Sequence, residues 1–291
     1  MLRINWLGRA VCVAAAFMSL VSVASAVTME TVPVGNAGNA DGVTGLGGVD
    51  YGYRMGKYEV TVGQYAEFLN ALADTDTYGL YDPYGMSHAH PPDISRNGAS
   101  GSYTYSITPG GANRPVTFVS WDSAARFANW MHNGQPSGAQ DANSTETGTY
   151  DLTGTQQYYQ PDGTTLEGDK NALCAALIAA TRQAGGRWAI PSEDEWYKAA
   201  YHQNDGVTGN YYNYPTGTSS TPGNDLVEPT DSGNNATHLM RYPANVGGRW
   251  TIVNDYTNGT SLPTCMTDVG AHENSGSAYG TFDQGGNASE W

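Results

Sequence analysis

The sequence predicts an α+β fold that is rich in loops and contains few helices. Glycine is frequent, with 37 residues, and the chain holds 20 tyrosines and 7 tryptophans. This composition favours irregular segments with aromatic side chains packed between them. Short apolar–polar alternations, which indicate strands, are separated by turn-forming residues. Two or three stretches show the periodicity of an amphipathic helix, too few for a helical bundle.

The first 26 residues have the pattern of a secretory signal. Arg3 and Arg9 form a basic start, residues 10–23 are mostly apolar, and Ala24-Ser-Ala26 offers a small-residue cleavage site. The apolar run is short for a membrane span, and no second run follows. We expect the signal to be removed and residues 27–291 to form one domain. The protein would then be secreted, periplasmic or on the cell surface, with no membrane span after cleavage.

The chain is strongly acidic, with a formal net charge of −15 at pH 7. Removal of the signal takes away two arginines and no acid, which makes the remainder more negative still. Such a charge repels nucleic acid and anionic membranes and attracts divalent cations. A solvated acidic surface that keeps the protein soluble is the simpler explanation of the charge. Both explanations argue against a nucleic-acid partner.

The first strands and the first helix are predicted near the start of this domain. Residues 27–49 indicate short strands joined by tight turns, and residues 51–60 alternate as a strand does. Thr61 and Gln64 then form a capping box, a sequence pattern that begins helices. Apolar side chains fall on one face of the following segment, which predicts a helix over residues 62–73.

The second helix is predicted after Ser120, which can cap its first turn. Residues 114–120 read as a strand that runs into this helix, and Asn133-Gly134 ends it. Residues 74–113 before it are predicted to be a loop. His88 and His90 in that loop could be metal ligands, but they have no partner at helical spacing. We therefore favour a solvated loop over a zinc site.

The third clear helix begins at Ser192, which forms a capping box with Glu195. The acids of its first turn are explained by the positive end of the helix dipole, so they do not require an acid–base role. Residues 187–190 before it are predicted to be a strand. Residues 171–183 indicate a short helix. Residues 135–169 are predicted to be an exposed insertion with weak structure, and residues 206–243 a further loop.

The segment 279–291 is a glycine-bent loop with polar and acidic side chains. Its glycines allow sharp bends that bring main-chain carbonyls towards Asn287 and Glu290. Amide, carboxylate and carbonyl oxygens around one point are the hard ligands that Ca²⁺ prefers. Trp291 would anchor the loop on a core. An ordinary acidic surface loop is the alternative.

This segment ends in Gly286-Asn-Ala-Ser-Glu-Trp291, which resembles the Gly-Asn-x-x-Glu-Trp signature of the formylglycine-generating enzyme (sulfatase-modifying factor) family. Further matches follow the family's order at Arg54–Leu72, Arg114–Asn133 and Arg187–Ala200. The resemblance implies an elaborated C-type-lectin-like fold with short antiparallel strands. It also implies an activity, the oxidation of a cysteine in a client polypeptide to formylglycine with oxygen and copper.

The resemblance implies a set of metal ligands. Asn245 and Asp255 match a first calcium site of the family, and Asn287 and Glu290 match a second. The family's copper is held by two cysteine thiolates downstream of the Glu-Trp motif. Cys174 and Cys265 lie upstream and do not match them; they could form a disulfide or remain separate thiols. We therefore expect a domain truncated at its C-terminus, with copper bound only if further cysteines follow.

Two functions follow from these observations. The first is a secreted sulfatase-modifying-factor-like protein that oxidises a client cysteine, with its catalytic cysteine segment absent from this chain. Catalytic residues cannot then be assigned. The alternative is a non-catalytic, calcium-stabilised extracellular module that binds a glycan or a peptide. Exposed aromatic faces and Asn or Asp side chains would suit a glycan.

Overall fold

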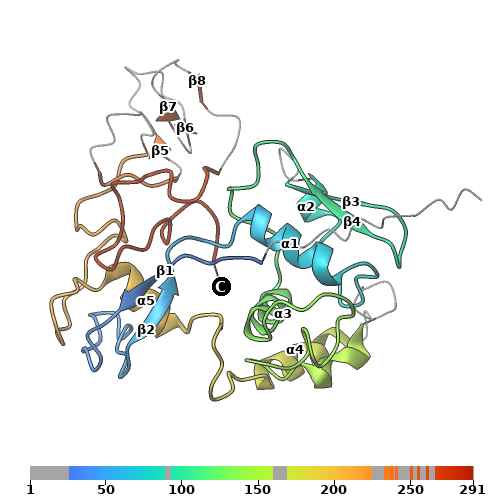
Figure 1. The fold of residues 1–291 in the computed structure, drawn as a ribbon. Helices are drawn as coiled ribbons and strands as arrows, with labels where there is room; N and C mark the ends of the chain where they lie inside the picture. The colour runs from blue at the N-terminus through green and yellow to red at the C-terminus, as the bar shows by residue number, and fades with distance from the viewer. Residues whose placement is uncertain are drawn as a thin grey trace, which may run out of the picture.

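The fold, seen in a computed structural model, consists of short elements joined by long irregular segments (Figure 1). The structure describes residues 26–88, 93–159, 169–224, 233–238, 240–241, 250–251, 254–255, 260–261 and 266–290. Its helices are α1 (Val62–Leu72), α2 (Gly85–His88), the 3₁₀ helix η1 (Thr153–Tyr158), α3 (Trp121–His132), α4 (Lys170–Ala179) and α5 (Glu193–Tyr201). Its strands form antiparallel pairs: β1 (Thr31–Val34) with β2 (Tyr53–Gly56), β3 (Ile94–Asn97) with β4 (Thr104–Ile107), β5 (Met240–Arg241) with β6 (Trp250–Thr251), and β7 (Asn254–Asp255) with β8 (Thr260–Ser261). The mixed, loop-rich α+β class predicted from the sequence is therefore confirmed.

The predicted helix starts are confirmed in atomic detail. At α1, the Thr61 side chain accepts a hydrogen bond from the Gln64 backbone, and the Gln64 side chain accepts one from the Thr61 backbone. The same reciprocal pair joins Ser192 and Glu195 at α5. Each box satisfies backbone N–H groups that have no partner inside the helix. At α3, Ser120 caps through the Ser123 N–H.

The main hydrophobic core lies between α1 and α3. The apolar face of α1 contributes Tyr65, Phe68 and Leu69, which are almost fully buried. Phe127 and Trp130 of α3 meet them, with the Phe68 and Phe127 rings packed edge to face at 5.3 Å. Aromatic side chains thus fill the space between irregular segments, as the composition predicts.

A second, smaller core lies between the β1–β2 pair and α5. Val34 and Ala199 are fully buried there, and Tyr279 from the C-terminal segment covers them. Tyr53 and Met55 of β2 pack on the same cluster. In Figure 1 the β1–β2 pair and α5 lie to one side of the C-terminal end of the chain, and α1 and α3 lie to the other.

Two buried cations join loops to the helices. Arg126 of α3 is fully buried and binds both carboxylate oxygens of Glu146, at 2.7 and 3.1 Å. Its guanidinium also lies over the rings of Tyr78 and Tyr159. Lys198 of α5 is fully buried as well, but its ammonium group donates to backbone carbonyls, and burial lowers its pKa.

Two predicted strands are wrong. In residues 114–120 only Pro115 pairs, as an isolated bridge with Thr61. Residues 187–190 form no strand because hydroxyl groups take their backbone hydrogen bonds. Thr149 donates to the Trp188 carbonyl, and Tyr150 accepts from the Ile190 N–H at 3.0 Å.

Two predicted loops contain more order than the sequence suggests. Residues 74–113, predicted to be a loop, contain α2, β3 and β4. Residues 135–159, part of the predicted exposed insertion, include buried Thr145, Glu146 and Leu152. The Glu146 carboxylate draws this segment inward because it pairs with Arg126. The predicted helix at 171–183 exists but ends earlier, at Ala179.

Some sequence predictions fall partly or wholly on residues that the structure does not describe. Residues 1–25 of the expected signal lie outside the described ranges, as does His90. The described part of the chain contains no helix of the length and apolarity needed to cross a membrane.

Candidate functional site

The C-terminal loop is shaped by two glycines that no other residue could replace without movement. A Cβ on Gly285 would lie 2.3 Å from Cγ of Pro215. A Cβ on Gly286 would lie 2.4 Å from the Thr237 carbonyl oxygen, and the φ of Gly286 is +128°. Asn287 follows in the left-handed region, with its N–H bonded to the same carbonyl at 2.8 Å. The bends expected from the sequence are therefore present and tightly packed.

Asn287 joins the C-terminal loop to the segment before α1. Its amide nitrogen donates to Oε2 of Glu59 at 2.9 Å, and its amide oxygen accepts from the Thr267 N–H at 2.9 Å. The backbone N–H of Ala288 donates to Oε1 of the same glutamate at 3.1 Å. Glu59 therefore holds the turn with both of its carboxylate oxygens.

Glu290 contacts helix α5. The indole N–H of Trp196, on α5, donates to its Oε2. The Glu290 side chain is accessible to solvent, yet protein surrounds it closely. This limited hydration, together with the nearby Asp283 carboxylate, raises the pKa of Glu290 to about 7, although the Trp196 bond opposes the shift.

Three carboxylates thus share one region: Glu59, Asp283 and Glu290. Burial raises the pKa of Glu59 to about 9, and repulsion from the other two carboxylates adds to the shift. Burial also raises the pKa of Asp283, whose Oδ2 accepts from the Gly270 N–H at 2.5 Å. Solvent screens Glu290 more than Glu59, so burial affects Glu59 more strongly than Glu290.

These groups are chemically suited to Ca²⁺, which takes carboxylate and amide oxygens. The Asn287 amide oxygen has two lone pairs, so it can accept from Thr267 and still face an ion. Within the described residues, however, no three His, Cys, Asp or Glu side chains converge to hold a metal. The loop supplies part of a ligand set and lacks a complete one.

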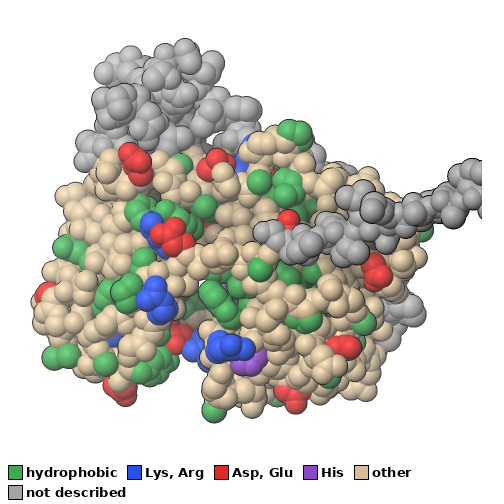
Figure 2. All heavy atoms as spheres, in the orientation of Figure 1, with side chains coloured by type: hydrophobic (Ala, Val, Ile, Leu, Met, Phe, Trp, Pro, Cys, Tyr) green, Lys and Arg blue, Asp and Glu red, His purple; other side chains and the backbone are tan. Residues whose placement is uncertain are grey.

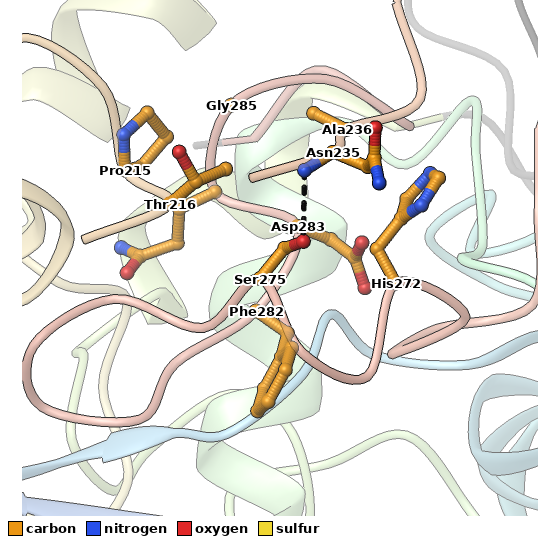
Figure 3. A pocket seen from close by; sticks show the side chains of 10 residues that line it. Pro215, Thr216, Asn235, Ala236, His272, Ser275, Phe282, Asp283 and Gly285 are labelled. Atoms are coloured by element: carbon orange, nitrogen blue, oxygen red, sulfur yellow. Dashed lines mark hydrogen bonds between the residues drawn. The ribbon is translucent and has the colours of Figure 1, made fainter. Parts of the chain in front are cut away.

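A small cavity lies behind the loop (Figure 3). It is lined by side chains that include Asp283, His272 and Ser275, and the Ser275 hydroxyl accepts from the Asn235 N–H at 2.8 Å. Its volume is about 10 Å³, which is the space that one water molecule needs. This cavity is too small for a substrate.

A large cleft of about 840 Å³ lies in front of the loop, between the two cores. Figure 2 shows hydrophobic side chains inside a hollow of this face and basic side chains at its edge. Glu59, Trp196 and Glu290 line it, so the C-terminal loop forms part of its wall. Its apolar lining comes from both halves of the fold: Met29, Met55, Val116, Val119, Phe127, Met131, Trp188 and Ile190.

Three arginines also line the cleft. Arg182 is paired with Glu195 at 2.8 Å. Arg54 donates to the Thr31 hydroxyl and carbonyl, and Arg187 donates to the His132 carbonyl at 2.8 Å. Neither Arg54 nor Arg187 has an ion pair with a described carboxylate. The cleft thus combines an apolar interior with guanidinium groups that an acidic ligand could bind.

The residues described do not fit a copper site made of two thiolates. They contain one cysteine, Cys174, which is free and exposed on α4. Cys265 lies outside the described residues. Soft Cu(I) needs thiolate ligands held close together, and the described residues provide no such pair.

Comparison with known proteins decides the family. Residues 48–291 match the family described as the sulfatase-modifying factor enzyme 1-like domain. The chain belongs to this family. The match covers most of the chain and includes the four motifs on which the resemblance was based. Searches of curated proteins and of solved structures gave no match.

The four ligands predicted for this sulfatase-modifying-factor chain have different outcomes. Asn287 and Glu290 lie in one loop, linked to Glu59 and Trp196 respectively. Asp255 lies in β7, but the position of its side chain is not described, and Asn245 lies outside the described residues. The calcium sites remain predictions. Sequence reasoning missed Glu59, because one acidic residue at the end of a strand carries no signal of a partner far along the chain.

Proposed function

We propose that this chain is a secreted sulfatase-modifying-factor-like protein that binds a client polypeptide in its central cleft. The observation that carries the proposal is the cleft itself, whose size and apolar lining suit several side chains of an extended segment. It lies between the two cores and has a volume of about 840 Å³, which is enough space for a ligand of that size.

The lining favours a polypeptide over a glycan. Most of its side chains are aliphatic or aromatic, and its charged groups are three arginines and three glutamates. A glycan is the second candidate, because the indole of Trp196 lies beside the Glu290 carboxylate. An aromatic face next to an acceptor oxygen is a suitable surface for a sugar ring.

The family resemblance implies oxidation of a client cysteine to formylglycine. In our proposal the described residues bind and orient the client, and we assign no catalytic residue among them. Copper would supply the oxygen chemistry only if thiolates outside the described residues hold it. An elaborated C-type-lectin-like arrangement, with short antiparallel strand pairs and long ordered loops, is part of the same proposal.

We further propose that Ca²⁺ stabilises the loop through Asn287 and Glu290, with Asn245 and Asp255 contributing a separate site. The support is the cluster of carboxylates with raised pKa values at this loop. A divalent cation would relieve their repulsion and favour their charged forms. The signal-like N-terminus supports a location outside the cytoplasm.

The test is binding of short peptides and glycans to purified protein, measured by the change in tryptophan fluorescence. The variant Ala124→Trp adds a large side chain to the cleft wall on α3. We expect it to weaken peptide binding by about tenfold or more, since it occupies ligand space. Ala172→Trp, on the exposed face of α4, should leave binding unchanged. The proposal fails if no peptide binds, and a response to glycans alone would favour the second candidate.

A further inference from the structure

The strand β2 has an open edge. The β1–β2 register places Arg54 opposite Pro33 and Gly56 opposite Thr31. The Lys57 N–H donates to the Glu30 carbonyl one position beyond the pair, which fixes the phase of the ladder. Because hydrogen-bonded and non-hydrogen-bonded pairs alternate, Arg54 and Gly56 belong to the non-bonded pairs. Their N–H and C=O groups therefore point away from β1.

This edge faces the cleft. Arg54, Met55 and Gly56 all line it. Among the described residues, no hydrogen bond reaches the backbone N–H or C=O of Arg54 or Gly56. The β1–β2 pairing ends at Gly56, and just past it the Phe282 N–H donates to the Lys57 carbonyl at 2.9 Å. An open edge is a template for pairing with another strand.

The charges at the rim of the cleft indicate which charge a ligand at this edge should carry. Within the described residues, the guanidinium groups of Arg54 and Arg187 donate only to a hydroxyl and to backbone carbonyls, whereas the third cleft arginine, Arg182, has a carboxylate partner. Acidic residues outnumber basic ones in this chain, 28 to 13. Two guanidinium groups that form no ion pair with a described carboxylate are thus a local positive feature that complements an acidic ligand.

We propose that an extended client strand carrying an acidic side chain adds to the edge of β2. Its backbone would pair with Arg54 and Gly56, its apolar side chains would enter the cleft, and its carboxylate would meet Arg54 or Arg187. Main-chain pairing provides affinity in this mode, and the pockets and charges provide selectivity. The inference rests on the proposed function, since it specifies how the same cleft takes a client polypeptide.

The probe is a set of short synthetic peptides that alternate valine and threonine and carry a single Glu, Gln or Lys at each position in turn. We expect the Glu peptides to bind most tightly. N-methylation at alternate amides, those facing β2, should weaken binding by about tenfold each, since it removes one ladder hydrogen bond and adds a clash. N-methylation at the intervening amides should have little effect.

A charge variant tests the second half of the inference. The double substitution Arg54→Glu and Arg187→Glu should shift the preference from Glu peptides to Lys peptides. Lys170→Glu, an exposed change of the same sign on α4, should leave the preference unchanged. If the double variant fails to fold, Arg187→Gln alone should reduce the preference for Glu without reversing it.

The outcomes separate this inference from the proposed function. Peptide binding without any alternation in the N-methyl series would overturn strand addition and leave the cleft as the client site. Absence of peptide binding would remove the proposed function as well. Slow amide hydrogen exchange at Arg54 and Gly56 in the peptide-free protein would show that the chain itself or a second copy already covers the edge. That result would also overturn the inference.

Discussion

Glu59 and Asn287 are 228 residues apart and share a hydrogen bond of 2.9 Å between the carboxylate and the side-chain amide. The same carboxylate accepts the N–H of Ala288, so one side chain fixes the C-terminal turn to the start of α1. This contact closes the wall of the cleft. The turn also carries the residues that match the family's second calcium site.

Replacing Glu59 with alanine should release the turn. The variant loses both hydrogen bonds and leaves the Asn287 amide and the Ala288 N–H without partners, which costs about 1–3 kcal/mol. We expect a lower midpoint of urea unfolding and faster hydrogen exchange at the Ala288 amide. Glu67→Ala, on the exposed face of α1, is the control and should change neither. An unchanged exchange rate in Glu59→Ala would show that other contacts hold the turn.

Removal of calcium should destabilise the protein. If Ca²⁺ binds only the folded loop, EDTA removes its contribution to the free energy of unfolding, and the melting temperature should drop by about 5 °C or more. Asn287→Ala should melt at a temperature that EDTA no longer changes. Asp50→Asn, at an exposed position, should still respond. Identical melts of the parent protein with and without EDTA would remove calcium from the account.

Gly286→Ala should be strongly destabilising. The added Cβ would meet the Thr237 carbonyl at 2.4 Å, and the φ of +128° is unfavourable for alanine. Backbone carbonyls cannot move aside as side chains do, so we expect a loss of about 2–3 kcal/mol in the free energy of unfolding. Gly154→Ala is the matched control, because a Cβ there meets nothing within 4 Å. Equal stabilities of the two variants would contradict the tight turn.

His202 should make the protein less stable in acid. Its Nδ1 accepts the N–H of Asn204 at 3.1 Å and lies 2.9 Å from the Tyr279 hydroxyl, so protonation there would oppose a donor. Burial lowers the pKa of His202 below its usual value of about 6.5. The folded state thus binds fewer protons than the unfolded state, and stability is lost as the pH falls below about 6.5, by up to about 1.4 kcal/mol per pH unit.

Urea unfolding between pH 8 and pH 5 measures this effect. His202→Gln should be less stable than the parent at pH 8 but should lose less stability on acidification. Gln183→Ala, an exposed change that removes no titratable group, should keep the slope of the parent. A slope that His202→Gln leaves unchanged would assign the acid sensitivity to other groups.

Local signals in the sequence predicted the elements that local chemistry decides. The capping boxes at Thr61 and Ser192 lie within three residues of their partners, so they can be read from the chain alone. The extended segment at 187–190 was predicted to be a strand because its composition fits one. Its actual partners are hydroxyl groups of Thr149 and Tyr150, which no local pattern shows.

The candidate site, too, could be predicted from the sequence only where local residues define it. The glycine bends and the polar residues Asn287 and Glu290 were visible as a segment, and the family resemblance gave them a role. Glu59 was invisible because its importance comes from a partner more than two hundred residues away. The cleft was equally unpredictable, since its lining is drawn from residues between Met29 and Glu290.

The burial of Arg126 and Lys198 affects how the molecule meets its surroundings. Both cations are buried, and Glu146, the ion-pair partner of Arg126, is buried as well. Few positive groups therefore remain on the outside to offset the acidic ones. Copies of the protein should repel one another at low ionic strength, and added salt should weaken that repulsion by shortening its range. The protein molecules should therefore stay well separated at low ionic strength and approach one another more closely at high ionic strength.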